Sequence, residues 1–204
     1  MTEADPGALP GPDGLLRCPW GVGTPLADDY RAYHDTEWGR PVHGDAALFE
    51  RVSLEAFQSG LSWLTILRKR EAFRAGFAGF DPAVVAGFGD DDVERLMADA
   101  GIVRNRAKVL ATLANARVVV ALQQAARDPG ALDVLLWSFA PVAGRAAPAT
   151  VADVPAVTPE STAMATALKG NGFRFVGPTT AYALMQATGM VDDHLAACAF
   201  RPVR

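Results

Sequence analysis

The stretch TAMATALKGNGFRFVGPTTAYALMQATG, residues 162–189, predicts two helices joined by a tight turn. Thr158-Pro159 opens the first helix and Pro178 opens the second, because proline is favoured at the first helical position. Gly172 and Gly177 in the turn permit positive φ and a close approach of the backbone to another molecule. The free N–H groups at the start of the second helix can hold an anion.

Two structures fit this pattern. A helix-hairpin-helix would bind a DNA phosphate at the turn, with Arg174 beside it. A plain αα-hairpin would only join two core helices. Arg174 stands between two aromatic residues in GFRFVG, which favours phosphate binding, so we predict a helix-hairpin-helix at about residues 160–189.

The rest of the chain is also helical in pattern. Asp45 and Ser62 can cap helices through AALFERVSLEAFQSG and WLTILRKREAFRAGF, and Asp81-Pro82 forms the N-cap and first residue of a short helix. Acidic residues at 90–94 begin a further helix, and residues 105–127 form one long helix. Strand signals are nearly absent, so we predict an all-α fold.

The first residues differ from the rest in composition. Residues 1–14 are rich in Gly, Pro and Asp without periodicity, which predicts a disordered leader. Residues 15–204 then form a single domain, in which a loop from Ala140 to Pro155 joins two parts.

The composition, 50% hydrophobic and 21% charged, is that of an ordinary globular protein. Apolar runs end before the about 18 residues that a membrane helix needs, and no signal peptide is recognisable, so we expect a cytoplasmic protein with no membrane contact. The net charge of −4 gives no general support to nucleic-acid binding. Basic residues at 68–74 and 104–108 would supply either a local DNA-facing patch or a solvated helix face.

Each of the two cysteines has a histidine nearby. Cys18 precedes His34 by 16 residues, and His194 precedes Cys198 by four. The i, i+4 spacing would place His194 and Cys198 on one helix face, as two ligands of one tetrahedral metal require. Two unrelated buried thiols are the alternative. We predict one structural Zn²⁺ bound by Cys18, His34, His194 and Cys198, which ties the two ends of the chain together.

A carboxylate lies on an otherwise apolar or small helix face, formed by positions 48, 52, 55 and 59. The simple interpretation is that Glu55 forms a salt bridge with Arg51 one turn back, because a buried carboxylate needs a partner. The functional interpretation is that aromatic rings beside this acid stack on a planar base while the acid hydrogen-bonds its edge. The aromatic cluster comprises Trp20, Tyr30, Tyr33, Trp38 and Trp63.

Several long strings resemble the bacterial 3-methyladenine DNA glycosylase I family. They are RCPW at 17–20, AYHDTEWGRP at 32–41, LFERVSLEAFQSGLSWLTILRKRE at 48–71, FDP at 80–82, DAGIVRNRAKVLATLANA at 99–116, WSF at 137–139 and GFRFVGPTTAYALMQATGMVDDH at 172–194. The resemblance covers roughly residues 17–200 and leaves the leader unexplained.

The resemblance implies a helix-hairpin-helix DNA glycosylase with a zinc-fastened second lobe, formed by the N- and C-terminal segments. It further implies a monomeric enzyme that removes N3-methyladenine from alkylated double-stranded DNA and leaves an abasic site. By position, Glu55 matches the acid that hydrogen-bonds the damaged base, and Leu61 matches the residue that fills the gap left in the duplex. Tyr33 and Trp63 match aromatic residues of the base pocket, and the four predicted zinc ligands match those of the family.

Two further positions bear on this comparison. Ala183 departs from the family, in which serine is frequent, at one minor pocket contact. Asp192 or Asp193 lies where the wider superfamily keeps a catalytic aspartate, although this narrower family is not thought to depend on one.

Two other classes of protein remain as alternatives. A zinc hydrolase would need an open coordination position, whereas two cysteines and two histidines saturate the ion. The deaminase pattern His-x-Glu is also missing, since Asp-Thr-Glu follows His34. A DNA-binding module would recognise the damage without releasing a base.

Overall fold

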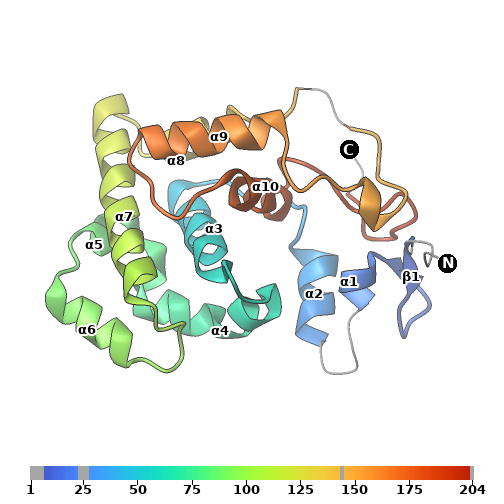
Figure 1. Cartoon of the computed structure of the whole chain (residues 1–204), viewed down its shortest axis with the longest axis horizontal. Coiled ribbons are helices and arrows are strands. Elements are labelled where there is room, and N and C mark those ends of the chain that lie inside the picture. The colour runs from blue at the N-terminus through green and yellow to red at the C-terminus, as the bar shows by residue number, and fades with distance from the viewer. Residues whose placement is uncertain (1–6, 23–27, 143–144, 203–204) are drawn as a thin grey trace.

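Helix α3 (Asp45–Gln58) forms the centre of the fold in the computed structural model, which describes residues 7–22, 28–142 and 145–202. Of its 14 residues, 11 are buried, so α3 is enclosed on all sides instead of along one stripe. Four helices pack around it: α4 (Trp63–Gly76), α7 (Arg106–Ala126), α8 (Ala131–Trp137) and α10 (Pro178–Ala187) (Figure 1). The sequence predicted an all-α fold; a mostly helical fold is confirmed, with a short two-stranded sheet in addition.

The remaining helices cover this core. Helices α5 (Pro82–Ala86) and α6 (Asp90–Ala98) pack on α7, and α9 (Pro159–Gly170) packs on α10. Single 3₁₀ turns lie at η1 (Ala78–Phe80) and η2 (Val151–Asp153). The predicted N-caps Ser62, Asp81 and Thr158 are confirmed, because each accepts a hydrogen bond from a backbone N–H of the helix that follows.

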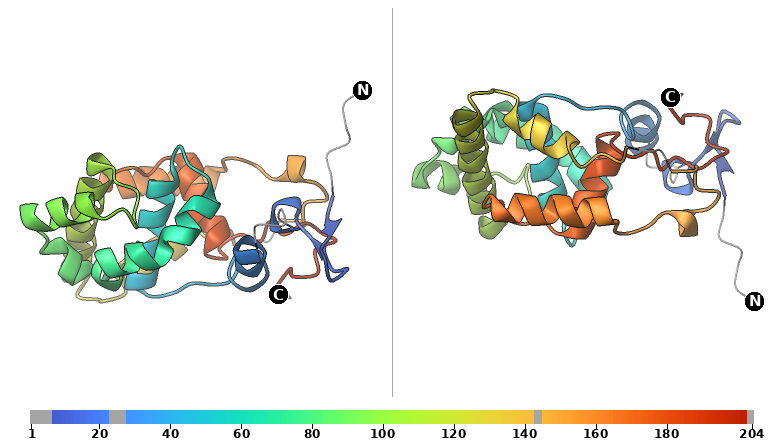
Figure 2. Two further views of the ribbon diagram at one scale, coloured as in Figure 1. Left: turned by 90° about the horizontal axis from the view of Figure 1, so that it is seen from below. Right: turned by 90° about the horizontal axis from the view of Figure 1, so that it is seen from above.

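A smaller lobe gathers segments from both ends of the chain (Figure 2). It contains the strands β1 (Leu9–Pro10) and β2 (Leu16–Arg17), the helices α1 (Pro19–Val22) and α2 (Asp28–Thr36), and residues 192–202. The backbone N–H of Ala199 donates to the carbonyl of Leu16 at 2.9 Å, which joins the C-terminal segment to β2.

The predicted disordered leader is wrong from Gly7 onward, while residues 1–6 lie outside the described residues. β1 pairs with β2 in antiparallel register, and the Asp13 carboxylate accepts a hydrogen bond from Arg17 at 2.7 Å. Gly- and Pro-rich composition is shared by disordered segments and tight turns, and here it forms the turn of a hairpin.

The predicted cap of α3 is also wrong. Gly44 occupies the N-cap, and the carboxylate of Asp45 accepts hydrogen bonds from the backbone N–H groups of Leu132 and Asp133 at 3.2 and 2.9 Å. Asp45 therefore satisfies the first turn of α8. The reason is tertiary, because the starts of α3 and α8 lie side by side.

Helix α7 is long and apolar enough to cross a membrane by length and composition alone. Core helices of globular proteins pass the same test. Because α7 packs against α3, α5, α6 and α8 and buries the polar side chains of Lys108 and Asn115, we interpret it as a core helix.

Candidate active site and metal centre

A cavity of about 290 Å³ lies where the smaller lobe meets the central helices. All five aromatic residues that the sequence analysis grouped with Glu55 line it together with that acid: Trp20, Tyr30, Tyr33, Trp38 and Trp63. Gln58, Ala183 and Gln186 complete part of the wall. The structure thus brings together residues from α1 to α4 and α10.

The Glu55 side chain is a buried carboxyl group on the wall of this cavity. It is 6% exposed, and its carboxyl group has no hydrogen-bond partner in the described part of the chain. The salt bridge to Arg51, which was the simple interpretation of this acid, is not formed, because Arg51 donates to Glu37 at 3.2 Å instead. Burial raises the pKa of Glu55 to about 8, although the positive charge of Arg51 opposes the shift. A buried acid with a perturbed pKa beside a cavity is typical of a ligand site.

The aromatic rings form two sides of the cavity. Tyr33 and Trp63 are buried, with ring centroids 5.4 Å apart and planes inclined by 45°. Trp20 stands 5.1 Å from Tyr30 and 4.9 Å from Trp38. Such rings offer faces on which a planar, positively charged base can stack.

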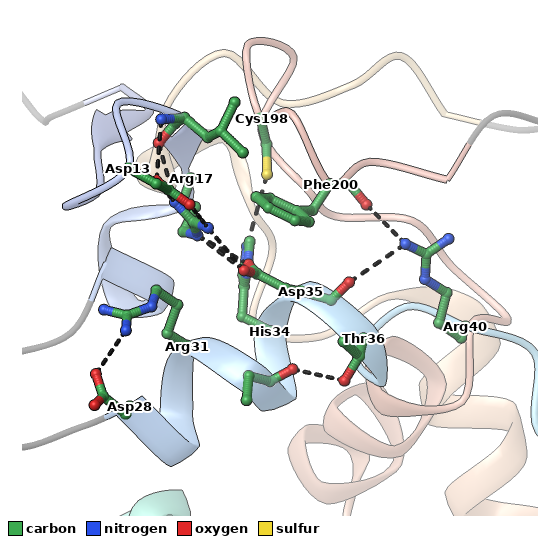
Figure 3. Close-up of polar contacts among 12 residues, drawn as sticks. Asp13, Arg17, Asp28, Arg31, His34, Asp35, Thr36, Arg40, Cys198 and Phe200 are labelled. Carbon is green, nitrogen blue, oxygen red and sulfur yellow. Dashed lines mark hydrogen bonds and ion pairs between the residues drawn. The ribbon is translucent and has the colours of Figure 1, made fainter.

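Three of the four predicted metal ligands converge. The ligand atoms of Cys18, His34 and Cys198 all lie within 4.8 Å of one another, and all three residues are buried. The Cys198 sulfur points toward Nε2 of His34 at 3.7 Å (Figure 3). A hydrogen bond with the Cys18 thiol lowers the pKa of Cys198 and raises that of Cys18, so the pair favours one thiolate.

His194 lies beside this triad, with its ring centroid 5.0 Å from that of His34. Its Nε2 atom is buried and has no hydrogen-bond partner among the residues that the structure describes. A buried nitrogen of this kind needs a proton donor or a metal ion. The triad and His194 thus offer two thiols and two imidazoles, which are donor types that zinc binds.

Carboxylates orient both imidazole rings. Asp35 binds Nδ1 of His34 at 2.8 Å, and Asp192 binds Nδ1 of His194 at 3.1 Å. Arg17 in turn holds Asp35 at 2.8 Å and lies over the ring of Phe200 (Figure 3). Since a carboxylate takes each Nδ1, Nε2 is the nitrogen that each ring would offer to a metal ion.

The predicted helix through VDDHLAAC is wrong. The segment forms a turn in which the N–H of Cys198 donates to the carbonyl of Leu195 at 2.8 Å. The Asp192 carboxylate accepts from the backbone N–H of His194 at 3.2 Å, a local bond that competes with helix formation. The i, i+4 spacing therefore does not place His194 and Cys198 on one helix face.

The carboxylates of Asp192 and Asp193 are both occupied. Asp193 is buried and accepts from Arg145, from the Tyr182 hydroxyl at 2.6 Å and from Gln186 at 2.8 Å. Asp192 binds His194 and accepts from Arg201 at 2.9 Å. These contacts tie both carboxylates to neighbouring side chains, and Asp193 also lines the cavity.

The predicted DNA-contacting residues lie in two connecting segments. Leu61 is 43% exposed in the turn between α3 and α4, and Arg174 is exposed in the turn between α9 and α10. Gly172 adopts φ +99°, as predicted, whereas Gly177 is the N-cap of α10 with φ −114° and does not require glycine for its backbone angles.

Of the two interpretations of the basic residues at 68–74 and 104–108, the structure favours the solvated helix face over the DNA-facing patch. Arg70 pairs with Glu37, Arg74 with Glu50 and Arg106 with Glu94, at 2.6–2.9 Å. Arg68 pairs with Asp29, Lys69 donates to the carbonyls of residues 100 and 101, and Lys108 is buried. Most of their charge is therefore used within the protein.

Two residues that contact the candidate metal ligands were missed from the sequence. Asp35 follows His34 directly, and an acid beside a proposed histidine ligand is a signal that could have identified it. Gly39 gives no such signal. A Cβ there would lie 2.8 Å from Cε1 of His194, so glycine makes room for that ring.

Known proteins share this sequence pattern. The sequence model of the methyladenine glycosylase family matches residues 23–202. The chain belongs to this family. It is 44% identical over 189 residues to DNA-3-methyladenine glycosylase 1 of Escherichia coli K12, covering 92% of this chain and 98% of the relative. As a glycosylase, it is an enzyme that hydrolyses N-glycosyl bonds.

Solved structures of this glycosylase family share the fold. A crystal structure of a 3-methyladenine DNA glycosylase I matches with a TM-score of 0.83 at 44% identity, covering 91% of this chain and 100% of that one. A structure that describes 3-methyladenine recognition by the Staphylococcus aureus enzyme matches with a TM-score of 0.83 at 34% identity, covering 91% and 97%. The glycosylase fold thus extends over nearly the whole chain.

Proposed function

We propose that this glycosylase removes N3-methyladenine from alkylated double-stranded DNA and leaves an abasic site. The observation that carries the proposal is the buried carboxyl group of Glu55 on the wall of an aromatic cavity. A base methylated at N3 is a cation, whereas adenine is neutral. Glu55 therefore favours the damaged base, because the cation lowers the pKa of the carboxyl group and is stabilised by its charge.

The chemistry needs little from the protein beyond binding. The damaged nucleotide leaves the duplex and enters the cavity, where Tyr33 and Trp63 stack on the cationic base and Glu55 faces its charge. The glycosidic bond breaks with its electron pair going to the base, which leaves as a neutral molecule without being protonated. Water adds to the sugar carbon and gives up a proton, so no strand is cut.

Incubation with methylated duplex DNA, followed by chromatography of the released bases, tests this function. We expect free 3-methyladenine with an intact DNA backbone. Strand cleavage would contradict the hydrolytic mechanism. Binding to the methylated duplex without base release would show a damage-binding module instead.

We also propose that one zinc ion binds Cys18, His34, His194 and Cys198. Support comes from the buried Nε2 of His194 and from the carboxylates on both Nδ1 atoms. Four protein ligands leave no position for water, so the ion supplies structure and no bond-breaking chemistry. The ring of Trp20 packs against His34 at 4.9 Å and that of Trp38 against His194 at 4.6 Å, so the cluster would fix this wall of the base cavity.

For the DNA face, we propose that α9 and α10 act as a helix-hairpin-helix. The backbone around Gly172 and Gly177, with Arg174, would bind a phosphate, since the first N–H groups of α10 have no side-chain cap within the described residues. Leu61 would fill the gap that the extruded nucleotide leaves. The enzyme would act as a cytoplasmic monomer, which light scattering of the purified protein tests.

Leu61→Ala is expected to lower excision from duplex DNA by about 10-fold, because the smaller side chain no longer fills the gap in the base stack. The free energy of unfolding should stay unchanged, since Leu61 is partly exposed. Excision from single-stranded DNA should fall less, as no gap opens there. Val134→Ala, at an exposed position on α8, serves as control, and equal losses in both variants would contradict the assignment.

A further inference from the structure

Helix α7 holds the backbone of both segments assigned above to the DNA face. Lys108 and Asn115 lie on the same side of this helix, two turns apart, and both are buried. Lys108 binds the segment that carries Leu61, and Asn115 binds the segment that carries Arg174.

Lys108 binds the end of α3. Its Nζ donates to the carbonyl of Phe57 at 2.9 Å and to that of Ser59 at 2.7 Å. These carbonyls belong to the last turn of a helix and have no further amide to accept from along the helix. The N–H of Leu61 donates to the carbonyl of Gln58 at 2.6 Å, between the two groups that Lys108 holds. Lys108 therefore fixes the backbone from which Leu61 projects.

Asn115 binds the turn between α9 and α10. Its side-chain oxygen accepts from the backbone N–H of Arg174 at 2.8 Å, and its side-chain nitrogen donates to the carbonyl of Arg174 at 3.1 Å. Two bonds to one residue fix both the position and the orientation of this peptide segment. Because Asn115 is buried, its effect on DNA must pass through the turn.

We propose that α7 sets the distance between the two DNA-contacting segments, with Lys108 and Asn115 as positioning residues for duplex binding. The inference rests on the proposed function. Seven residues of α-helix span about 10 Å, a fixed length within a rigid element. A duplex must meet Leu61 and the hairpin at the same time, so its affinity depends on their spacing. Neither Lys108 nor Asn115 lines the base cavity.

Lys108→Met and Asn115→Leu, singly and combined, test the proposal against Thr112→Val. Thr112 is a matched control, since it is buried on α7 between the two and its hydroxyl donates only to the carbonyl of Lys108. Fluorescence anisotropy measures affinity for a duplex with an abasic-site analogue. Quenching of tryptophan fluorescence measures affinity for free 3-methyladenine. Lys108→Gln and Asn115→Asp each keep part of the hydrogen bonding. They replace Lys108→Met or Asn115→Leu in the test if one of those variants does not fold.

We expect each strong variant to lose at least about 10-fold in duplex affinity while free-base affinity changes less than about twofold. The mild variants should fall in between, and Thr112→Val should change neither affinity. In the combined variant the loss of duplex affinity should be smaller than the product of the two single losses. Either substitution alone already removes the fixed distance between the two segments. Multiplying losses would show two independent local contacts and overturn the proposal, as would unchanged duplex affinity or a parallel fall of both affinities.

Release of 3-methyladenine by the unaltered protein is measured alongside. If the unaltered protein released no 3-methyladenine, the proposed function would be wrong, whereas duplex affinity would still test the role of α7. If the unaltered protein released the base and the variants kept full duplex affinity, only the inference about α7 would be wrong.

Discussion

Glu55→Gln is expected to reduce release of 3-methyladenine from methylated duplex DNA by at least about 100-fold. The amide has nearly the same shape but lacks the negative charge that faces the cationic base. Affinity for a duplex with an abasic-site analogue should be retained, because Glu55 lies inside the cavity. Single-turnover release, followed by chromatography, measures the loss. Full activity of this variant would remove the central support for the proposed function.

The same substitution is expected to stabilise the fold, and increasingly so at higher pH. With a pKa of about 8 in the folded protein against an ordinary value of 4.5, Glu55 keeps a proton in the native state that the unfolded state has lost. Native stability therefore falls as pH rises from 4.5 through 8 and then levels off. Glu55→Gln has no group that titrates here, so its free energy of unfolding does not fall in this way. Its excess over that of the unaltered protein should be about 2 kcal/mol larger at pH 8 than at pH 6. Denaturant unfolding at both values measures it.

Glu50→Gln is the matched control for both measurements. Glu50 is also buried on α3, but its carboxylate pairs with Arg74 at 2.8 Å and does not line the cavity. We expect this variant to keep its activity and to lose stability, the opposite of Glu55→Gln. If the two variants behaved alike, the distinction between a ligand-binding acid and a paired acid would not hold.

Cys198→Ser is expected to abolish stoichiometric zinc binding and to lower the melting temperature by more than about 10 °C, because the binding free energy of a structural metal is folding free energy. Metal analysis of the purified protein should show one zinc ion per unaltered chain. Excision per folded molecule should be largely retained, since the ion has no open position for water. His43→Asn, at the third histidine and outside the cluster, is the control and should change neither quantity.

Two outcomes would contradict this account of the metal centre. A zinc-free protein that stays folded and loses all activity would assign the ion a catalytic role. Unaltered protein that is purified without metal, with both thiols reactive, would show that the cluster is only a group of buried polar residues.

Local sequence signals were sufficient for most of the helices. The caps at Ser62, Asp81 and Thr158 and the long helix α7 were predicted correctly, because a cap or a helical period is decided within a few residues along the chain. The errors at Asp45 and in VDDHLAAC have one cause. In both places a carboxylate bonds backbone groups in a manner that the spacing of residue types does not specify.

The set of residues in the candidate site was also evident before the structure, since the aromatic residues and Glu55 do line one cavity. Which of these residues are paired and which are charged was not evident from the sequence. That Arg51 would pair with Glu37, leaving Glu55 buried at the cavity wall, depends on residues brought together from separate helices. The ion pairs of the α4 arginines and the hydrogen bonds of Lys108 also depend on residues from separate segments.

The sequence by itself thus determined the helical fold, the family to which the resemblance pointed and the residues available for a base pocket and a metal centre. Only the tertiary structure decided which charged groups are paired, how both histidine rings are oriented, and that α7 binds both segments proposed to contact DNA. The physical reason is the sequence separation over which each interaction acts. Helix formation depends on neighbours within one or two turns, whereas pairing and burial of polar groups depend on distances between segments far apart in the chain.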